Sequence, residues 1–279
     1  MLKTRVLTAL ILLAAFLLAL FGLPPFGWAA VAGLIAAVAA WEWGALLRWS
    51  TPARAALGAI TLIVCDALAV LMPAPLGLGD LFPLSLAWSF GSWFYQPAAA
   101  FWLLLVPLWL WRRWPLPGGA LGLAVGAVVI FPTWLALLHL RQGGAVFLLA
   151  IMALVWVADI AAYFSGRAFG KHKLAPSISP GKTWEGAIGA GLAVLLYGYL
   201  LSDYLPPALR DSPLRLILVM FALTAVSVVG DLFESLLKRH AGLKDSSNIL
   251  PGHGGVLDRI DSLTSTLPLV TLVWLAAQL

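Results

Sequence analysis

Long apolar segments, separated by short polar ones, run through almost the whole chain. About 20 apolar residues are enough for a helix to cross the hydrocarbon core of a bilayer. Windows of this kind lie at 5–22, 27–47, 55–72, 119–139, 145–165, 184–201, 214–234 and 263–279, and a shorter segment rich in Trp and Leu lies at 97–111. The pattern predicts an all-α, polytopic integral membrane protein with eight or nine transmembrane helices.

The segment 76–95 interrupts this pattern. It mixes Pro, Gly, Asp80 and many aromatic residues, so its apolar tract is too broken to predict a span. An interfacial segment and a re-entrant segment both remain open for it. Prolines elsewhere gather between the apolar windows, where ending a helix costs little.

The composition excludes an ordinary soluble protein. Of the 279 residues, 62% are hydrophobic and only 10% are charged, whereas a soluble domain is nearer half apolar and a quarter charged. A chain with so few polar groups cannot cover its surface in water, so lipid is the solvent for most of it. We expect one integral membrane unit, in which residues 1–140 form N-terminal transmembrane helices and residues 141–279 form C-terminal helices that carry two polar loops.

The basic residues fall on one side of the predicted membrane. With the N-terminus inside and nine spans, Arg141, Arg210 and Arg215 are placed outside, and the rest of the 17 Lys and Arg residues are placed inside. Such a bias is expected of cytoplasmic loops, so the net charge of +5 does not indicate nucleic-acid binding. We predict a cytoplasmic N-terminus, both polar loops in the cytoplasm and, for a bacterial source, the cytoplasmic (inner) membrane.

Polar residues are costly in such a chain, so the places where they gather are informative. The first cluster runs from Asp159 to Gly186. Asp159, Tyr163 and Gly166 are spaced i, i+4, i+7 and share one face at the end of a helix. Thr183 stands where it can cap the next helix. The basic residues of this loop are Arg167, Lys171, His172, Lys173 and Lys182.

Two functions fit this first loop. Backbone N–H groups at the start of a helix, with lysines nearby, form a natural phosphate site. The alternative is a basic juxtamembrane loop that follows the positive-inside rule or contacts anionic lipid. The hydroxyl groups between the lysines and the carboxylate of Asp159 favour the phosphate site.

The second cluster runs from Gly230 to Ser265. Asp231, Ser235 and Lys238 lie on one helical face, and Asp258 and Asp261 share a face at the start of the last helix. Acids converging from two helices beside basic residues suit a divalent cation that takes carboxylate and phosphate oxygens. The alternative is a set of ion pairs between helices, such as membrane proteins also contain.

Three further residues have more than one interpretation. His253, in a glycine-rich turn, can ligate a metal, bind phosphate or pack in the turn, and no His/Cys set has zinc spacing. Glu42 and Asp66 are intramembrane acids outside the clusters. We interpret Glu42, between two tryptophans, as interfacial, and we expect Asp66 to make a hydrogen bond between helices.

The second cluster also resembles a known family. The run from Ser235 through Lys238-Arg239 and Lys244-Asp245 to the stretch Pro251–Asp261 is similar to the signature of phosphatidate cytidylyltransferases, with no departure from that pattern. The segment from Asp159 to Gly186 resembles another characteristic segment of that family. A pattern of many fixed positions with fixed gaps is far more specific than a lone glycine motif.

The resemblance implies an α-helical membrane enzyme, often a homodimer, that moves CMP from CTP to phosphatidic acid with Mg²⁺ and a monovalent cation such as K⁺. It implies Asp231 and Asp258 as metal ligands with Asp261 adjacent. The residues that it assigns to phosphate and nucleotide are Ser235, Lys238, Arg239, Lys244, His253 and Arg259. Among these, we place Lys238 and Lys244 with Asp231, Asp258 and Asp261 in the catalytic set. From the first loop, Asp159, Tyr163, Arg167, Lys171 and Lys182 complete the substrate-binding set.

Two other functions fit part of the sequence. A transporter or channel fits the composition, but it predicts polar residues near mid-membrane in several helices. Another lipid-phosphate transferase, such as a polyprenol kinase or a CDP-alcohol phosphotransferase, is the second alternative, although the motif of the latter is absent. Neither accounts for the run from Ser235 to Asp261.

Overall fold

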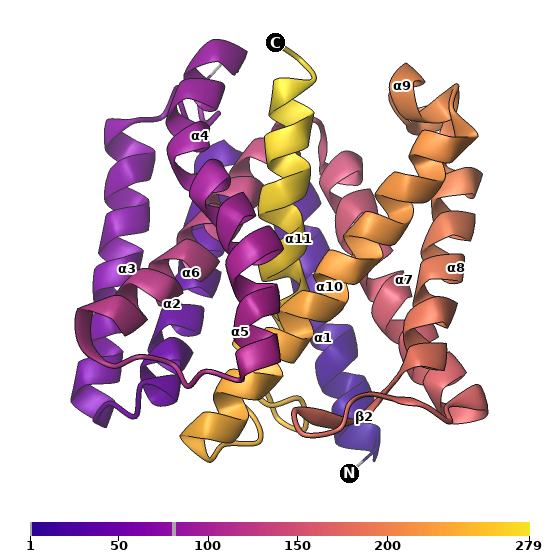
Figure 1. Ribbon diagram of the computed structural model, residues 1–279. Coiled ribbons are helices and arrows are strands. Elements are labelled where there is room, and N and C mark those ends of the chain that lie inside the picture. Colours follow the sequence, from indigo (N-terminus) through magenta and orange to yellow (C-terminus); the bar gives the residue numbers. More distant parts are fainter. Residues whose placement is uncertain (1, 80–81) are drawn as a thin grey trace.

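The apolar windows correspond to helices in the computed structural model, which describes residues 2–79 and 82–279 (Figure 1). The first seven helical segments are α1 (Leu2–Gly22), α2 (Pro25–Leu46), α3 (Thr51–Leu71), α4 (Leu84–Ala100), the π-helical η1 (Phe101–Leu105), α5 (Val106–Arg112) and α6 (Gly119–Gln142). The remaining ones are α7 (Ala145–Phe169), α8 (Trp184–Leu200), the short 3₁₀ turn η2 (Ser202–Tyr204), α9 (Pro207–Arg210), α10 (Pro213–Ala241) and α11 (Leu257–Ala276). Two short strands, β1 (Lys173–Ala175) and β2 (Ser179–Thr183), join α7 to α8.

Helical stretches long and apolar enough to cross a membrane confirm the prediction of an all-α membrane protein. Within the described residues they are Pro25–Leu46, Thr51–Leu71, Leu84–Arg112, Gly119–Gln142, Ala145–Phe169 and Pro213–Ala241. Val6–Gly22 and Trp184–Leu200 are shorter apolar helices. The last helix, α11, begins six residues before its predicted apolar window because its first turns carry polar residues.

The segment 76–95 contains part of a long helix. From Leu84, α4 continues through η1 into α5 and forms one apolar helical stretch of 29 residues that ends at Arg112. The predicted window at 97–111 was therefore too short at its N-terminal end. Pro97, which lacks the N–H of the helical ladder, lies inside this stretch, just before the π-helical turn. Asp80, in the same segment, lies outside the described residues.

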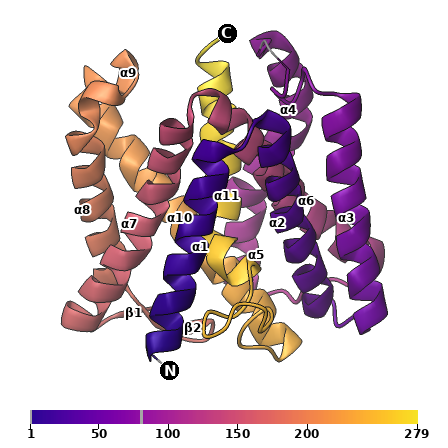
Figure 2. The same ribbon diagram turned by 180° about the vertical axis from the view of Figure 1, so that it is seen from behind.

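Helix α11 lies at the centre of the bundle and packs against α4, α6 and α10 (Figures 1 and 2). Its buried face is rich in Ser and Thr, whose small side chains allow close helix approach in a membrane protein. These hydroxyl groups donate to backbone carbonyls of the helices: Thr266 to Ser262 O at 2.8 Å, and Ser265 to Val226 O of α10 at 2.9 Å. Because these hydroxyl groups bond to backbone carbonyls, a helix with many polar residues can occupy the middle of the fold.

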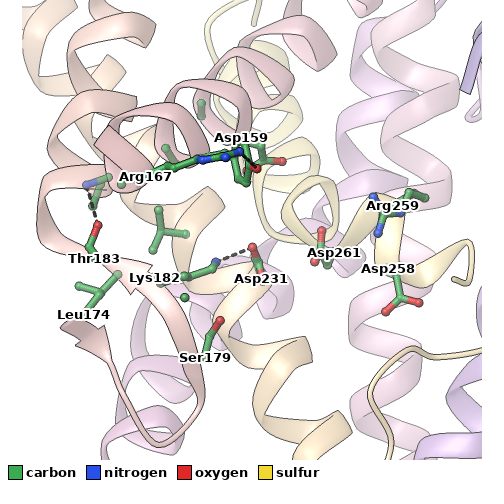
Figure 3. Close-up of a pocket in the computed structure, with 18 of the residues that line it drawn as sticks. Asp159, Arg167, Leu174, Ser179, Lys182, Thr183, Asp231, Asp258, Arg259 and Asp261 are labelled. Carbon is green, nitrogen blue, oxygen red and sulfur yellow. Dashed lines mark hydrogen bonds and ion pairs between the residues drawn. The ribbon is translucent and has the colours of Figure 1, made fainter. Parts of the chain in front are cut away.

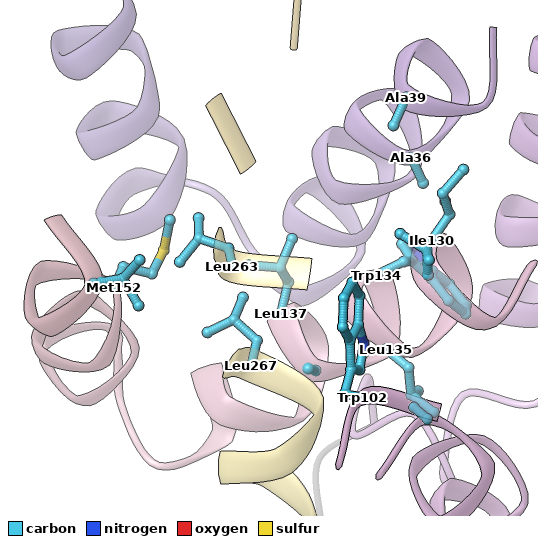
Figure 4. Packing of buried hydrophobic residues seen from close by; sticks show 14 of the residues in the cluster. Ala36, Ala39, Trp102, Ile130, Trp134, Leu135, Leu137, Met152, Leu263 and Leu267 are labelled. Atoms are coloured by element: carbon cyan, nitrogen blue, oxygen red, sulfur yellow. The ribbon is translucent and has the colours of Figure 1, made fainter. Parts of the chain in front are cut away.

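Large aromatic and aliphatic side chains fill the space around α11. Trp134 and Leu137 of α6 pack near Leu263 and Leu267 of α11 in the buried cluster (Figure 4). The indole of Trp28 donates to Leu137 O at 3.0 Å, which satisfies its N–H inside the bundle. This packing is what holds α11, and the polar residues at its start, in a defined position.

The polar loops gather at one end of the bundle. The strands pair antiparallel, with Lys173 opposite Thr183 and Ala175 opposite Ser179. Figures 1 and 2 show this hairpin beside the loop that joins α10 to α11, at the end where α1 begins. Helix α11 ends at the opposite side.

Candidate active site

A cavity of about 560 Å³ opens beside the hairpin, where α7, α8, α10 and α11 meet (Figure 3). It brings together residues of both polar clusters, which residues 187–229 separate in the sequence. The predicted site residues that line it are Asp159, Tyr163, Arg167, Lys182, Asp231, Lys238, Asp258, Arg259 and Asp261. The i, i+4, i+7 face of α7 predicted for Asp159, Tyr163 and Gly166 is present on its wall.

The remaining predicted residues lie around this cavity. Lys244 and His253 line a neighbouring cavity of about 410 Å³, and both cavities share Asp245 and Arg259. Lys171 lines neither and is exposed at the start of the hairpin segment.

Two α10 residues of the predicted set, Ser235 and Arg239, do not line the cavity. Ser235 donates its hydroxyl to Asp231 Oδ1 at 3.2 Å. Arg239 reaches Ile178 O of the hairpin turn at 3.5 Å. Both therefore contact residues beside the cavity.

A close crossing of α10 and α11 places two of the acids together. Gly230 faces α11 so tightly that a Cβ there would lie 2.4 Å from Ser265 Oγ and 2.8 Å from Asp261 O. Asp231 follows directly in α10, and Figure 3 shows Asp261 between Asp231 and Asp258 across the cavity. The absence of a side chain at position 230 is thus what lets carboxylates of two helices approach.

Lysines from two elements pair with these acids. Lys182 of β2 forms an ion pair with Asp231 Oδ2 (Figure 3). Lys238 lies between two carboxylates, 2.6 Å from Glu234 Oε2 and 2.5 Å from Asp258 Oδ1. Because the side chains of Lys238 and Glu234 are only 12% and 6% exposed, this is a buried charge cluster rather than a surface pair.

Asp258 is held by the loop that precedes it. Its Oδ2 accepts hydrogen bonds from Ser246 N at 2.9 Å, Ser246 Oγ at 2.9 Å and Gly255 N at 2.7 Å. Gly254 supports this arrangement with φ of +82°, a conformation that L side chains rarely adopt. The glycine-rich stretch thus folds back so that its amides point at the first turn of α11.

Acids outnumber bases in this site. The cavity wall carries five Asp and four Lys or Arg residues, and buried Glu234 adds a further carboxylate beside Lys238. Glu234 Oε1 is buried without a hydrogen-bond partner. Among the salt bridges within the described part of the chain, none involves Asp261, whose Oδ1 accepts from Ser262 N at 2.7 Å.

This donor set fits a hard cation by charge and chemistry, since it consists of oxygens with an excess of negative charge. In residues 2–79 and 82–279, no group of three or more His, Cys, Asp or Glu side chains is close enough together to hold a metal ion. Lys182 and Lys238 contact the acids instead.

The rim of the cavity suits a membrane surface. Arg167 Nη1 donates to Tyr163 Oη at 3.0 Å, and the Tyr163 side chain is exposed. Phe164, Phe169 and Trp184 are exposed near it on α7 and α8. Aromatic and basic side chains of this kind are typical of the headgroup level of a bilayer.

The hairpin is anchored to α8 at both of its ends. Thr183 accepts a hydrogen bond from Gly186 N at 3.1 Å, which confirms the predicted N-cap. His172 Nδ1 lies 2.7 Å from Glu185 Oε1. These contacts fix the position of β2 and therefore of Lys182.

The interpretation of Glu42 as interfacial is wrong. Its side chain is completely buried and lies at the loop between α10 and α11, where it accepts hydrogen bonds from Ser246, Ser247, Val256 and Leu257. Flanking tryptophans mark a membrane interface only when the side chain between them faces out, and here it faces the protein.

A model of the cytidylyltransferase family matches residues 3–276. This chain belongs to the cytidylyltransferase family. The phosphatidate cytidylyltransferase of Pseudomonas aeruginosa is 42% identical to it over 99% of this chain and 98% of the relative. That of Haemophilus influenzae is 39% identical over 96% of each chain.

A third relative, the phosphatidate cytidylyltransferase of Brucella suis, is 49% identical over 44% of each chain. The family membership agrees with the resemblance found in the run from Ser235 to Asp261. As a member of this family, the chain is a nucleotidyltransferase.

Sequence reasoning missed Glu234, Ser246 and Glu42 as parts of the site. Glu234 lies three residues after Asp231 and four before Lys238, beside the predicted face, but it was not among the predicted site residues. Ser246 lies in the polar run Ser246-Ser247-Asn248, which carries no local pattern of a site residue. For Glu42 the only signal was a carboxylate within an apolar window, which is expensive unless it is satisfied.

Proposed function

We propose that this protein is a phosphatidate cytidylyltransferase, which transfers CMP from CTP to phosphatidic acid and forms CDP-diacylglycerol and pyrophosphate. The observation that carries the proposal is the cavity at one end of a membrane bundle, lined by acids and bases from both polar clusters. The full-length relatives with this name support the choice of substrates. Acyl chains can remain in lipid while the headgroup meets soluble CTP.

We assign Asp231 and Asp258 as the residues that hold Mg²⁺, with Asp261 adjacent. The excess of carboxylates and the unpaired oxygen of Glu234 support a cation at this point. When bound, Mg²⁺ with its K⁺ companion would neutralise the triphosphate charge and polarise its oxygens. Lys182 and Lys238, which now contact the acids, would turn toward phosphate oxygens.

The chemistry demands little acid–base catalysis. An oxygen of the lipid phosphate forms a bond to the α-phosphorus of CTP, and the bond from that phosphorus to the oxygen bridging to the β-phosphate breaks. The electron pair leaves with pyrophosphate. Because the attacking oxygen is already anionic, the protein's task is to bring two anions together and to stabilise the charge that develops.

Basic residues divide this task between the two cavities. Lys238, Lys244 and Arg259 are placed to stabilise the triphosphate and the departing pyrophosphate, since Arg259 lines both cavities. Arg167 at the rim and Lys182 on the hairpin complete the anion site for the lipid phosphate. Ser235, Arg239, His253, Lys171, Asp159 and Tyr163 complete the proposed substrate-binding set.

We propose eight or nine spans with a cytoplasmic N-terminus, in a bacterial cytoplasmic membrane. The start of α1 lies at the same end of the bundle as the hairpin and the α10–α11 loop, which supports this orientation. Residues 141–279 supply the whole lining of both cavities, which supports the proposed division from residues 1–140. A homodimer is a further proposal from the family resemblance.

The test uses purified protein in detergent with phosphatidic acid and CTP labelled with ³²P at the α-phosphate. Label should move into the chloroform phase only with Mg²⁺ present. Asp258→Asn should abolish this transfer, whereas Asp203→Asn, an exposed carboxylate after α8, should leave it unchanged. Folded wild-type protein that transfers no label with Mg²⁺ and K⁺ supplied would refute the proposal.

A further inference from the structure

Glu42 of α2 belongs to no predicted part of the site, yet it is completely buried against the loop that precedes Asp258. We infer that Glu42 is a positioning residue, which holds the α10–α11 loop in the shape that orients Asp258 and thereby sets the affinity of the site for a divalent cation. This inference rests on the proposed function in one respect, the assignment of Asp258 to the cation.

Both oxygens of the Glu42 carboxylate are used in the same way. Oε1 accepts from Ser247 Oγ at 2.6 Å and from Val256 N at 2.9 Å. Oε2 accepts from Ser246 Oγ at 3.1 Å and from Leu257 N at 2.6 Å. Each oxygen therefore joins one hydroxyl of the loop to one backbone N–H at the start of α11.

The contacts continue from Glu42 to Asp258 through one side chain. The Ser246 hydroxyl lies 3.1 Å from Glu42 Oε2 and 2.9 Å from Asp258 Oδ2, so the two carboxylates share its single proton. Ser247, by contrast, contacts Glu42 and has no hydrogen bond to Asp258 among those of the described chain. Moving Glu42 therefore moves a group that touches the cation-holding acid.

Gly255 shows how closely the loop is fitted to Glu42. A Cβ at this position would lie 2.3 Å from Glu42 Oε1 and 2.0 Å from Ser246 Oγ, distances that real atoms do not show. The Gly255 amide also donates to Asp258 at 2.7 Å. The glycine is required because the carboxylate of α2 fills the space that a side chain would need.

Helix α2 holds both ends of this loop. Glu42 meets the N-terminus of α11, and Arg48, just after α2, donates through Nη2 to His240 O near the end of α10. A negative group at a helix start and a positive group at a helix end both favour the helix dipole. The contacts of Glu42 and Arg48 therefore fix the two ends of the α10–α11 loop relative to α2.

The negative charge of Glu42 matters because its four partners are all donors. None of the salt bridges found among residues 2–79 and 82–279 involves Glu42. In Glu42→Gln one oxygen becomes an NH₂ group. A serine hydroxyl can turn to accept from that group, but a backbone N–H cannot, so one contact to the start of α11 is lost.

The experiment compares Glu42→Gln, Ser246→Ala and Ser247→Ala with a control, Asp66→Asn. Asp66 of α3 is exposed and, contrary to the expectation from the sequence, makes no hydrogen bond to another helix within the described residues. Mn²⁺ binding is measured by the loss of the free-ion EPR signal, with no substrate present. The Mg²⁺ concentration for half-maximal activity and the KM for phosphatidic acid are measured on the same preparations. Monodispersity and thermal melting establish that each variant is folded.

We expect Glu42→Gln to weaken Mn²⁺ binding and to raise the half-maximal Mg²⁺ concentration by about tenfold or more, the size typical of losing a group that orients a metal ligand. Ser246→Ala should show a larger effect than Ser247→Ala because, of these two serines, only Ser246 contacts Asp258. The KM for phosphatidic acid should stay unchanged in these variants. The control Asp66→Asn should bind Mn²⁺ and respond to Mg²⁺ like wild type.

Folded Glu42→Gln that binds Mn²⁺ like wild type overturns the inference, even where its turnover is lower. If Glu42→Gln does not fold, Ser246→Ala decides in the same way. The EPR arm also separates this inference from the proposed function. Wild-type protein that binds Mn²⁺ through Asp258 but transfers no CMP would refute the proposed reaction and leave the role of Glu42 testable.

Discussion

The crossing of α10 and α11 at Gly230 offers a sharp test of the site's geometry. In Gly230→Ala the new Cβ would lie 2.8 Å from the carbonyl oxygen of Asp261 and 2.4 Å from Ser265 Oγ. The serine hydroxyl can rotate away, but the backbone carbonyl cannot. It must move by about half an ångström or more to reach an ordinary contact distance.

That displacement acts on Asp231 and Asp261, which flank the contact on the two helices. Overpacking of this kind costs about 1–3 kcal/mol of stability, which a bundle of this size tolerates. A misplacement of about 1 Å at a reacting centre can cost about a hundredfold in rate. We therefore expect Gly230→Ala to fold and to lose about tenfold to a hundredfold in kcat.

The assay is the initial rate of labelled lipid formation, measured beside a thermal melting curve. The matched control is Gly198→Ala, where the new Cβ would meet Met220 Sδ of α10 at 2.8 Å, a flexible side chain that can move aside. Folded Gly230→Ala with activity within about twofold of wild type would refute the argument. Equal loss in Gly198→Ala would show that helix packing in general, rather than this crossing, governs the rate.

Two further predictions concern charged side chains at the cavity. Lys238→Met should lower stability by about 3–5 kcal/mol, because it leaves the buried carboxylates of Glu234 and Asp258 without their shared partner; a melting temperature equal to wild type would contradict this. Arg167→Ala should raise the KM for phosphatidic acid several-fold with little change in the KM for CTP, because Arg167 lies at the exposed rim with Tyr163. Steady-state kinetics in mixed micelles would check it, and an effect on CTP alone would refute it.

The arrangement also gives the first half of the chain a structural role beside the site. Residues of 141–279 line both cavities, yet the loop before α11 is held by Glu42 and Arg48 from α2. The N-terminal helices therefore do more than anchor the protein in the bilayer. They fix the position of the loop on which Asp258 depends.

The helices and the identity of the polar clusters followed from the sequence alone. Each apolar window became a helix because the backbone must satisfy its hydrogen bonds locally in lipid. Charged residues are expensive in such a chain, so the runs around Asp159 and Asp231 were visible as clusters. The spacing from Ser235 to Asp261 was specific enough to resemble the family that the full-length comparison then showed.

Only the tertiary structure decided which groups meet. Lys182 reaches Asp231, and Lys238 reaches Asp258, from different elements, and no local pattern encodes those pairs. Glu42 looked like an isolated interfacial acid because its four donors lie more than 200 positions away. Periodicity reports which face of a helix is apolar, whereas the partner of a buried carboxylate depends on how the helices pack.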